Sequence, residues 1–428
     1  MSIERRAFLK TIGAAVVAGL PVSEALPASV TSPAPEAERQ SESVKRYLQS
    51  GINYEQDNEF YSLFQRSPVT GLGYEEGITR RDPSDVIQVG DLYYVWYTRT
   101  RKGPPPVGIA KAMANPTLRA FSWDLAEVWY ASSPDGHNWT ERGVAVHRGP
   151  KGGYDARSVC TPNILVAKGR YYLFYQAAAS LVQGQRGGGD FAQNVIGMSW
   201  AKSPEGPWTR AEEPVLKTGP AGAFDHRFIH DPSLIVREGK YWLYYKGQPG
   251  GPLARGHEES PLSLDIDRQV RLVRAEGAGS GRDARWGIPI AWGVAVADRP
   301  EGPYVKSGLN PVVCGGHETE LWPYRRGVCA LLWQGPEKFS LQYAEDGLNF
   351  VPKAQGLDVP RSAGFYRADK FIDTDSQPGP GITWGLHHAV HNKWLYLVRF
   401  DCDLTLQRGD QIRKNNEELQ KWLATQHT

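Results

Sequence analysis

Two aspartates and a histidine-glutamate pair occupy corresponding places in a repeated sequence pattern. Asp82 and Asp231 each begin an Asp-Pro-Ser segment followed by a β-branched apolar run, and His317 and Glu318 precede a weaker copy of that run. If they converge on one pocket, these side chains supply a base, an acid and charge stabilisation. An inverting glycosidase needs a carboxylate that deprotonates water and a proton donor on the opposite face of the sugar. The pattern therefore indicates hydrolytic chemistry on a sugar.

The identity of the proton donor stays open between His317 and Glu318. Histidine is an uncommon donor, but its ordinary pKa near 6.5 suits the role if neighbouring carboxylates keep it protonated. Alternation along a strand places adjacent side chains on opposite faces, so both reach the pocket only if this segment is still a loop. Gly315 and Gly316 favour a turn there. The alternatives are that His317 is structural and that the Asp-Pro pairs only cap strands through Asx turns.

A hairpin-like pattern recurs five times and must position these residues. The copies begin at 82, 161, 231, 320 and 388, so they lie 79, 70, 89 and 68 residues apart. Each combines a β-branched run, a tight turn and an aromatic-rich run, typical of a β-hairpin. A second motif, a turn glycine before an aromatic residue, lies at 133–139, 203–208, 298–304 and 344–350. We predict an all-β five-bladed β-propeller, with a β-sandwich or β-helix as the alternative.

In a propeller the innermost strand of each blade begins beside the central channel, so the first residues of the repeats converge. Asp82 and Asp231 are then expected to face one another across a funnel. Other polar residues near the blade starts are candidate sugar contacts, and Trp123 and Trp286 are candidate stacking platforms. The candidate contacts are Arg80, Thr161, Lys246, Glu320 and His388.

Composition narrows the class of ligand. The chain has 428 residues with a formal net charge of +2, which argues against nucleic acid or an anionic membrane as a partner and predicts a neutral ligand. Its 14 Trp, 20 Tyr and 13 Phe suit sheet packing and sugar stacking. The four cysteines are far apart and form no zinc-binding pattern, so we expect buried thiols. They are Cys160, Cys314, Cys329 and Cys402.

The N-terminal segment has the features of an export signal. Arg5 and Arg6 precede a short apolar run at 12–22, which resembles a twin-arginine signal, although Glu4 stands where Ser or Thr is usual. The run is too short to span a membrane. We predict a periplasmic or secreted protein with no membrane contact after signal removal. The predicted divisions are a signal and linker at 1–37, a short helical extension at 38–60, the propeller at 61–408 and a C-terminal helix at 409–428.

Four segments together resemble glycoside hydrolase family 117: 58–64, 71–84, 230–233 and 316–323. The resemblance implies a five-bladed propeller that removes 3,6-anhydro-L-galactose, with inversion, from the non-reducing end of neoagaro-oligosaccharides. It also implies that Asp82 is the general base, His317 the general acid, and Asp231 and Glu318 supporting acidic residues. Two alternatives stay open: a propeller glycosidase acting on an arabinose- or galactose-type sugar, and a non-catalytic sugar-binding propeller.

The same resemblance implies a partner. Members of that family exchange an N-terminal helical extension within a dimer through a Ser-x-Ala-Ile-x-Arg pattern. The matching segment is 41–46, where Ser43 and Val44 replace Ala and Ile. A homodimer through the N-terminal extension is therefore expected. The resemblance implies no organic cofactor, and metal ions are associated with sites in that family, so a bound divalent cation is compatible with the prediction although no ligand cluster in the sequence requires one.

Overall fold

The computed structural model describes residues 40–48, 58–181, 194–220, 223–248, 290–316, 319–333, 335, 337–367 and 381–426. All of them belong to one compact unit, Gln40–Thr428. The predicted signal and linker, Trp286, and the candidate acids His317 and Glu318 lie outside the described residues.

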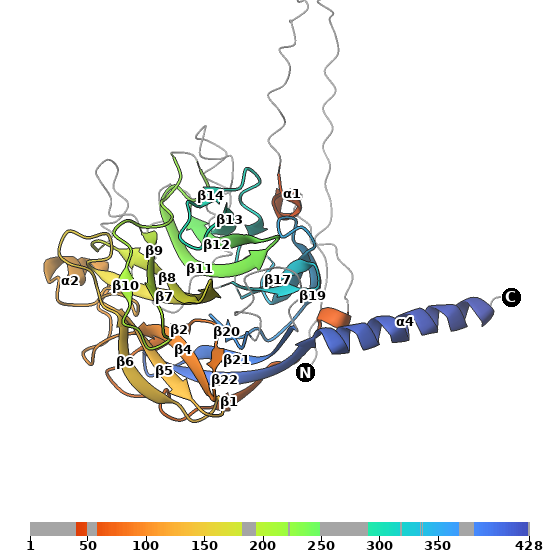
Figure 1. Ribbon diagram of the computed structural model, residues 1–428, viewed down its shortest axis with the longest axis horizontal. Coiled ribbons are helices and arrows are strands. Elements are labelled where there is room, and N and C mark those ends of the chain that lie inside the picture. Colours follow the sequence, from red (N-terminus) through yellow and green to blue (C-terminus); the bar gives the residue numbers. More distant parts are fainter. Residues whose placement is uncertain are drawn as a thin grey trace, which may run out of the picture. The chain divides into compact units, whose positions relative to one another are not determined.

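Five antiparallel sheets follow one another along the chain, and Figure 1 shows them placed around a common centre. We number these blades in chain order. Blade 1 contains β2 (Arg80–Pro83), β3 (Ile87–Val89), β4 (Leu92–Arg99), β5 (Glu127–Ser133) and β6 (Thr140–Val146). Blade 2 contains β7 (Ser158–Ala167), β8 (Arg170–Ala178), β9 (Val195–Ala201) and β10 (Thr209–Arg210).

The other three blades repeat this arrangement. Blade 3 contains β11 (Phe228–Arg237), β12 (Lys240–Gln248), β13 (Ala291–Ala297), β14 (Val305–Lys306) and β15 (Val313–Cys314). Blade 4 contains β16 (Glu320–Tyr324), β17 (Gly327–Leu332), β18 (Ser340–Ala344) and β19 (Val351–Gln355). Blade 5 contains β20 (Gly364–Phe365), β21 (Gly381–His391), β22 (Trp394–Thr405) and β1 (Gln65–Pro68). The first strands of neighbouring blades contact one another, β2 with β7, β7 with β11 and β11 with β16. The predicted five-bladed β-propeller is confirmed.

The fifth blade closes the ring with strands from both parts of the chain. β1 pairs with β22 as the outermost strand, with Gln65 opposite Asp401 and Pro68 opposite Val398. The fifth repeat therefore begins at β20 and not at 388, because the hairpin predicted there joins the second and third strands of the blade. β20 has only two residues and carries no alternating pattern, so the long hairpin after it gives the stronger sequence signal.

The second sequence motif packs neighbouring blades together. Trp208 of blade 2 meets Trp96 of blade 1 with ring centroids 5.9 Å apart. In the same way, Tyr304 meets Phe174 at 6.0 Å, and Phe350 meets Tyr244 at 6.2 Å. In these three copies the aromatic residue after the turn glycine thus packs on the second strand of the preceding blade. This repeated contact explains why both sequence motifs are rich in aromatic residues.

The described residues contain four helical segments beside the blades: α1 (Glu42–Leu48), the 3-10 turn η1 (Asn58–Phe60), α2 (Ile109–Ala114) and α4 (Leu406–Gln426). α4, at the blue end of the chain in Figure 1, begins at Leu406, slightly before the predicted position 409. None of the described helices is long and apolar enough to cross a membrane. Cys160, Cys314, Cys329 and Cys402 are all free thiols, and the first three are buried.

Candidate active site

Residues near the start of four inner strands share an unusual backbone conformation. Asp82, Thr161 and Asp231 have φ values of 48°, 49° and 49°, and Ser362, just before β20, has 49°. A left-handed φ is rare outside glycine and especially unfavourable for a β-branched residue such as Thr161. Each of the first three lies in a β-bulge that interrupts pairing with the second strand. The bulges take these side chains out of the regular alternation of the strand.

Asp82 is held by residues from three blades. Arg81 Nε lies 2.6 Å from Oδ2, and the hydroxyls of Thr98 and Thr161 each donate to Oδ2 at 3.3 Å. Ser362 donates to Oδ1 at 2.9 Å. Thr98 lies near the end of the second strand of blade 1, Thr161 belongs to blade 2 and Ser362 precedes the first strand of blade 5. The predicted convergence of blade starts is therefore realised around this carboxylate.

The electrostatics of Asp82 keep it ionised. Its side chain is only 2% exposed, and this burial pushes its pKa upward. The Arg81 guanidinium and the contact with His388 outweigh burial and hold the pKa of Asp82 well below its usual range. His388 Nδ1 lies 3.4 Å from Asp82 Oδ1. An ionised, fixed carboxylate can accept a proton but cannot donate one, which suits a base and excludes the acid role at neutral pH.

The second aspartate, Asp231, forms an ion pair with a lysine. Lys246 Nζ lies 2.5 Å from Asp231 Oδ2, and both residues are buried. The pKa of the Cys160 thiol is raised by burial and further by the negative charges of Asp82 and Asp231, since β7 lies within reach of both. The two carboxylates thus stand on either side of one inner strand, each paired with a different cation.

The other predicted contacts are placed differently. Arg80 Nε binds Glu141 at 3.0 Å and its Nη2 binds Glu75 at 3.0 Å, so its guanidinium is held within blade 1 and Arg81 takes the place at Asp82. Glu320 opens β16 and is half-buried. Trp123 stacks on Phe121 with ring centroids 5.0 Å apart.

Three residues around Asp82 were not among the sequence-based candidates: Arg81, Thr98 and Ser362. Of these three residues, only Arg81 could be suspected from the sequence, because it directly precedes Asp82. Regular alternation would place Arg80, not Arg81, on the face of Asp82, so the pattern favours the wrong arginine. Ser362 lies before a two-residue strand with no repeat signature, and Thr98 lies 16 residues after Asp82 on the paired strand, opposite Arg81. Neither can be found without the fold.

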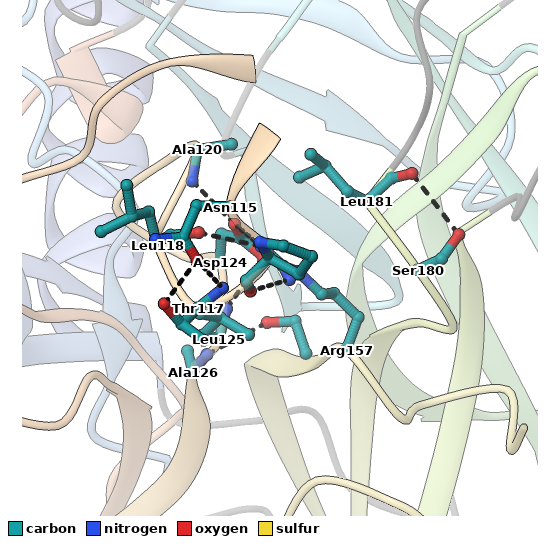
Figure 2. A network of polar contacts seen from close by, with 12 residues as sticks. Asn115, Thr117, Leu118, Ala120, Asp124, Leu125, Ala126, Arg157, Ser180 and Leu181 are labelled. Carbon is teal, nitrogen blue, oxygen red and sulfur yellow. Dashed lines mark hydrogen bonds and ion pairs between the residues drawn. The ribbon is translucent and has the colours of Figure 1, made fainter. Parts of the chain in front are cut away.

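The segment that connects β4 and β5 lies beside Arg81 and is held in place by hydrogen bonds. Ser122 in this connection accepts a hydrogen bond from Arg81 Nη1 at 2.6 Å. Figure 2 shows what fixes the segment: Arg157 binds Asp124 through two bonds of 2.7 Å and also donates to the carbonyl of Leu118. Bidentate arginine-carboxylate pairs are rigid and directional. The pair therefore ties this connection of blade 1 to the start of β7.

The described part of the chain contains no group of three or more His, Cys, Asp or Glu side chains that could hold a metal ion. His317 and Glu318 lie outside the described residues, so the divalent cation stays a prediction.

Comparisons with known proteins agree with this geometry. Residues 78–264 match the family model for glycosyl hydrolases family 43. A solved structure of Zg3597, a family 117 glycoside hydrolase produced by the marine bacterium Zobellia galactanivorans, is 37% identical, with a TM-score of 0.67 over 82% of this chain and 93% of that chain. A solved structure of a BT0996 complex with RGII shares the fold at 12% identity, with a TM-score of 0.52 over 81% and 92% of the two chains. No curated protein matches the chain. At 37% identity over most of both chains, this glycoside hydrolase belongs to family 117.

Proposed function

We propose that the protein removes 3,6-anhydro-L-galactose from the non-reducing end of neoagaro-oligosaccharides with inversion of configuration. The observation that carries the proposal is the Asp82 carboxylate, buried and bound by residues of three blades in a member of family 117. In this proposal Asp82 is the general base and His317 the general acid. Asp231, with its Lys246 partner, and Glu318 stabilise charge and hold the sugar.

The contacts of Asp82 support the role of base. Arg81, Thr98, Thr161 and Ser362 fix its position and keep it ionised. In an inverting reaction such a carboxylate takes a proton from water while that water attacks the anomeric carbon. The donor protonates the glycosidic oxygen from the opposite face, and the bond to the leaving sugar breaks in the same step. His388, which lies beside Asp82, is a candidate contact for the sugar.

The proposal includes export and a dimer. We propose the twin-arginine route to the periplasm, and no organic cofactor. For the dimer, the contacts of α1 give support: Ser41 donates to the Pro311 carbonyl at 2.8 Å, and Ser43 Oγ accepts from the Cys314 backbone at 2.7 Å. Arg46 pairs with Glu337 at 2.9 Å. The residues of the expected exchange pattern thus contact blades 3 and 4 of their own chain, and in the proposed dimer they make the same contacts with the partner subunit.

The test is hydrolysis of neoagarobiose followed by proton NMR of the anomeric signals. Release of 3,6-anhydro-L-galactose with initially inverted configuration is the expected result. Asp82→Asn is expected to lower kcat by about 10³ while binding of the sugar persists, because positioned acid-base groups contribute 10²- to 10⁴-fold. Full activity of this variant would exclude Asp82 as the base. Binding without any turnover in the parent protein would support the sugar-binding alternative instead.

A second candidate function has one observation in its favour. The family 43 model matches residues 78–264, which include both Asp82 and Asp231. This match favours testing arabinose- and galactose-type substrates alongside neoagarobiose. Turnover of an aryl arabinofuranoside or galactoside, with none of neoagarobiose, would replace the first proposal by the second.

A further inference from the structure

The C-terminal helix α4 carries a row of exposed apolar side chains. Leu419, Trp422 and Leu423 are all exposed, and spacings of three and four residues place them on one face of the helix. Ile412, seven residues before Leu419, continues this face and is half-buried. The base of α4 contacts η1 and β22, and Figure 1 shows the rest of the helix extending away from the blades. An exposed apolar face of this kind is typical of a protein interface.

The same face continues into exposed apolar residues at the base of the helix. Arg408 lies four residues before Ile412 and therefore on the same face. Its Nη2 donates to the carbonyl of Tyr61 at 2.9 Å, which places the segment of Tyr61 and Leu63 beside the start of α4. Both of these side chains are exposed. Apolar groups thus lie at the two ends of one face, and the helical rise separates Arg408 from Leu423 by about 22 Å.

The charges between these two ends identify the partner. Arg413 and Lys414 come first and Glu417 and Glu418 follow, and all four are exposed. Arg413 also binds Glu59 of its own chain. An antiparallel pair of α4 helices, centred between residues 415 and 416, places the basic pair of each helix opposite the acidic pair of the other. A parallel pair in register would place like charges together, which is unfavourable.

The antiparallel arrangement also matches the apolar residues. It places Ile412 of one helix opposite Leu419 of the other. It also brings Trp422 and Leu423 at each tip to the base of the other helix, where Tyr61 and Leu63 are exposed. A surface that complements itself through a two-fold axis is the form that interfaces between identical subunits take. The partner that fits this face is therefore a second copy of the same chain.

We propose that α4 pairs with α4 of a second copy of the chain in an antiparallel two-helix interface. The tip of each helix covers Tyr61 and Leu63 of the partner subunit, and the two-fold axis passes between residues 415 and 416. This interface is separate from the proposed exchange of α1, which uses blades 3 and 4. It is also independent of which sugar the enzyme cleaves.

The first test is disulfide cross-linking of single-cysteine substitutions in the full chain. Asn415→Cys is expected to form a cross-linked dimer under mild oxidation, because the two copies of this residue meet near the axis. Leu423→Cys is expected to form none, because the antiparallel pair separates its two copies by about 22 Å, far beyond the reach of a disulfide. The wild-type protein, with its native free thiols, is the control and should stay uncross-linked.

The second test measures association by sedimentation equilibrium. Leu419→Glu combined with Trp422→Glu is expected to weaken the association by at least about 100-fold, since it removes two buried apolar side chains from the interface. Gln420→Glu combined with Ala424→Glu is the matched control. It adds the same charge to the same exposed part of α4, outside the apolar face, and should retain the wild-type constant. Circular dichroism would check that the variants keep the helix.

Other occupants of the face give different results. In a dimer held only by exchange of α1, Asn415→Cys would stay uncross-linked, and this outcome would overturn the interface. Equal cross-linking of Asn415→Cys and Leu423→Cys would show a parallel pair and would also overturn it. A wild-type protein that stays monomeric at its highest soluble concentration would exclude a second copy. In that monomer, protection of Leu423→Cys from a maleimide would assign the face to another segment of the same chain.

The interface and the proposed function fail separately, because none of these measurements depends on hydrolysis. Cross-linking of Asn415→Cys in a protein inactive on neoagarobiose would refute the proposed function alone. Hydrolysis of neoagarobiose by a protein whose association is unaffected by Leu419→Glu with Trp422→Glu would refute the interface alone.

Discussion

The Asp82 carboxylate is bound at both oxygens by groups that come from separate stretches of the chain. Arg81 supplies the nearest charge, and neutral hydroxyls of Thr98, Thr161 and Ser362 complete the shell. The Arg81 guanidinium matters most for ionisation, because a cation at this distance lowers the pKa of a carboxyl by about one to three units, and the contact with His388 lowers the pKa of Asp82 further. The neutral donors mainly fix the direction in which the oxygens point.

Replacing Arg81 with Gln therefore tests the origin of the low pKa. Loss of the positive charge raises the pKa of Asp82, so the carboxylate becomes protonated at a higher pH on the acidic side. The acidic limb of the kcat/KM profile is expected to move to higher pH by about one unit or more. Ser362→Ala, which removes a neutral donor, should move it much less. An unchanged limb in Arg81→Gln would show that Arg81 does not set the ionisation of Asp82.

The buried carboxylate of Glu59 helps to attach the base of α4 to the propeller. Glu59 in η1 accepts from Tyr324 at 2.9 Å and from Arg325 at 2.8 Å, and it also binds Arg413 of α4. Burial raises the pKa of Glu59, but the hydrogen bonds from Arg413, Arg325 and Tyr324 outweigh it and leave the pKa below its usual value. Blade 4, η1 and the C-terminal helix thus meet at this group.

Glu59→Gln is expected to lower the free energy of unfolding by about 2 kcal/mol at neutral pH, because it removes the charged acceptor that Tyr324, Arg325 and Arg413 share. The folded-state pKa is depressed, so the stabilisation is complete above the unfolded value of about 4.3 and is lost as pH falls through the folded pKa. Urea denaturation at pH 7 and at successively lower pH would measure both effects. The difference between wild type and variant should shrink as the pH falls; a constant difference would contradict the assignment.

Beyond its base, α4 contributes little packing to the propeller. Leu419, Trp422 and Leu423 are 50%, 57% and 38% exposed, so the C-terminal part of the helix buries little apolar surface against the described blades. The sequence pattern predicts an apolar face on this helix, but the pattern alone does not say what the face packs against.

At the scale of the whole molecule, the ring depends on a strand far from its blade in the sequence. β1 completes blade 5 by pairing with β22, and the bridge between Val86 and Tyr366 joins blade 5 to blade 1. A closed ring leaves few exposed sheet edges. Removing its last strand should therefore affect the entire fold and not only one blade.

Two truncated chains test this closure. A chain that begins at residue 69 lacks η1 and β1, whereas one that begins at residue 58 keeps both, and neither contains α1. The shorter chain is expected to melt at least several degrees lower and less cooperatively, because an open edge and the loss of Glu59 act together. Calorimetry of the pair would measure the difference. Equal melting curves would show that β1 is dispensable for ring closure.

The five-fold repeat, the all-β class and the Asp-Pro positions can be predicted from the amino-acid sequence, because alternation, turn glycines and aromatic runs are local patterns that repeat with every blade. The folded chain was needed to show that Arg81 and not Arg80 reaches Asp82, since a bulge with a left-handed residue reverses the alternation. It was also needed to bring Thr98 and Ser362 to the carboxylate. Local patterns depend on neighbours in the chain, whereas a site built from several blades depends on contacts between residues as many as hundreds of positions apart.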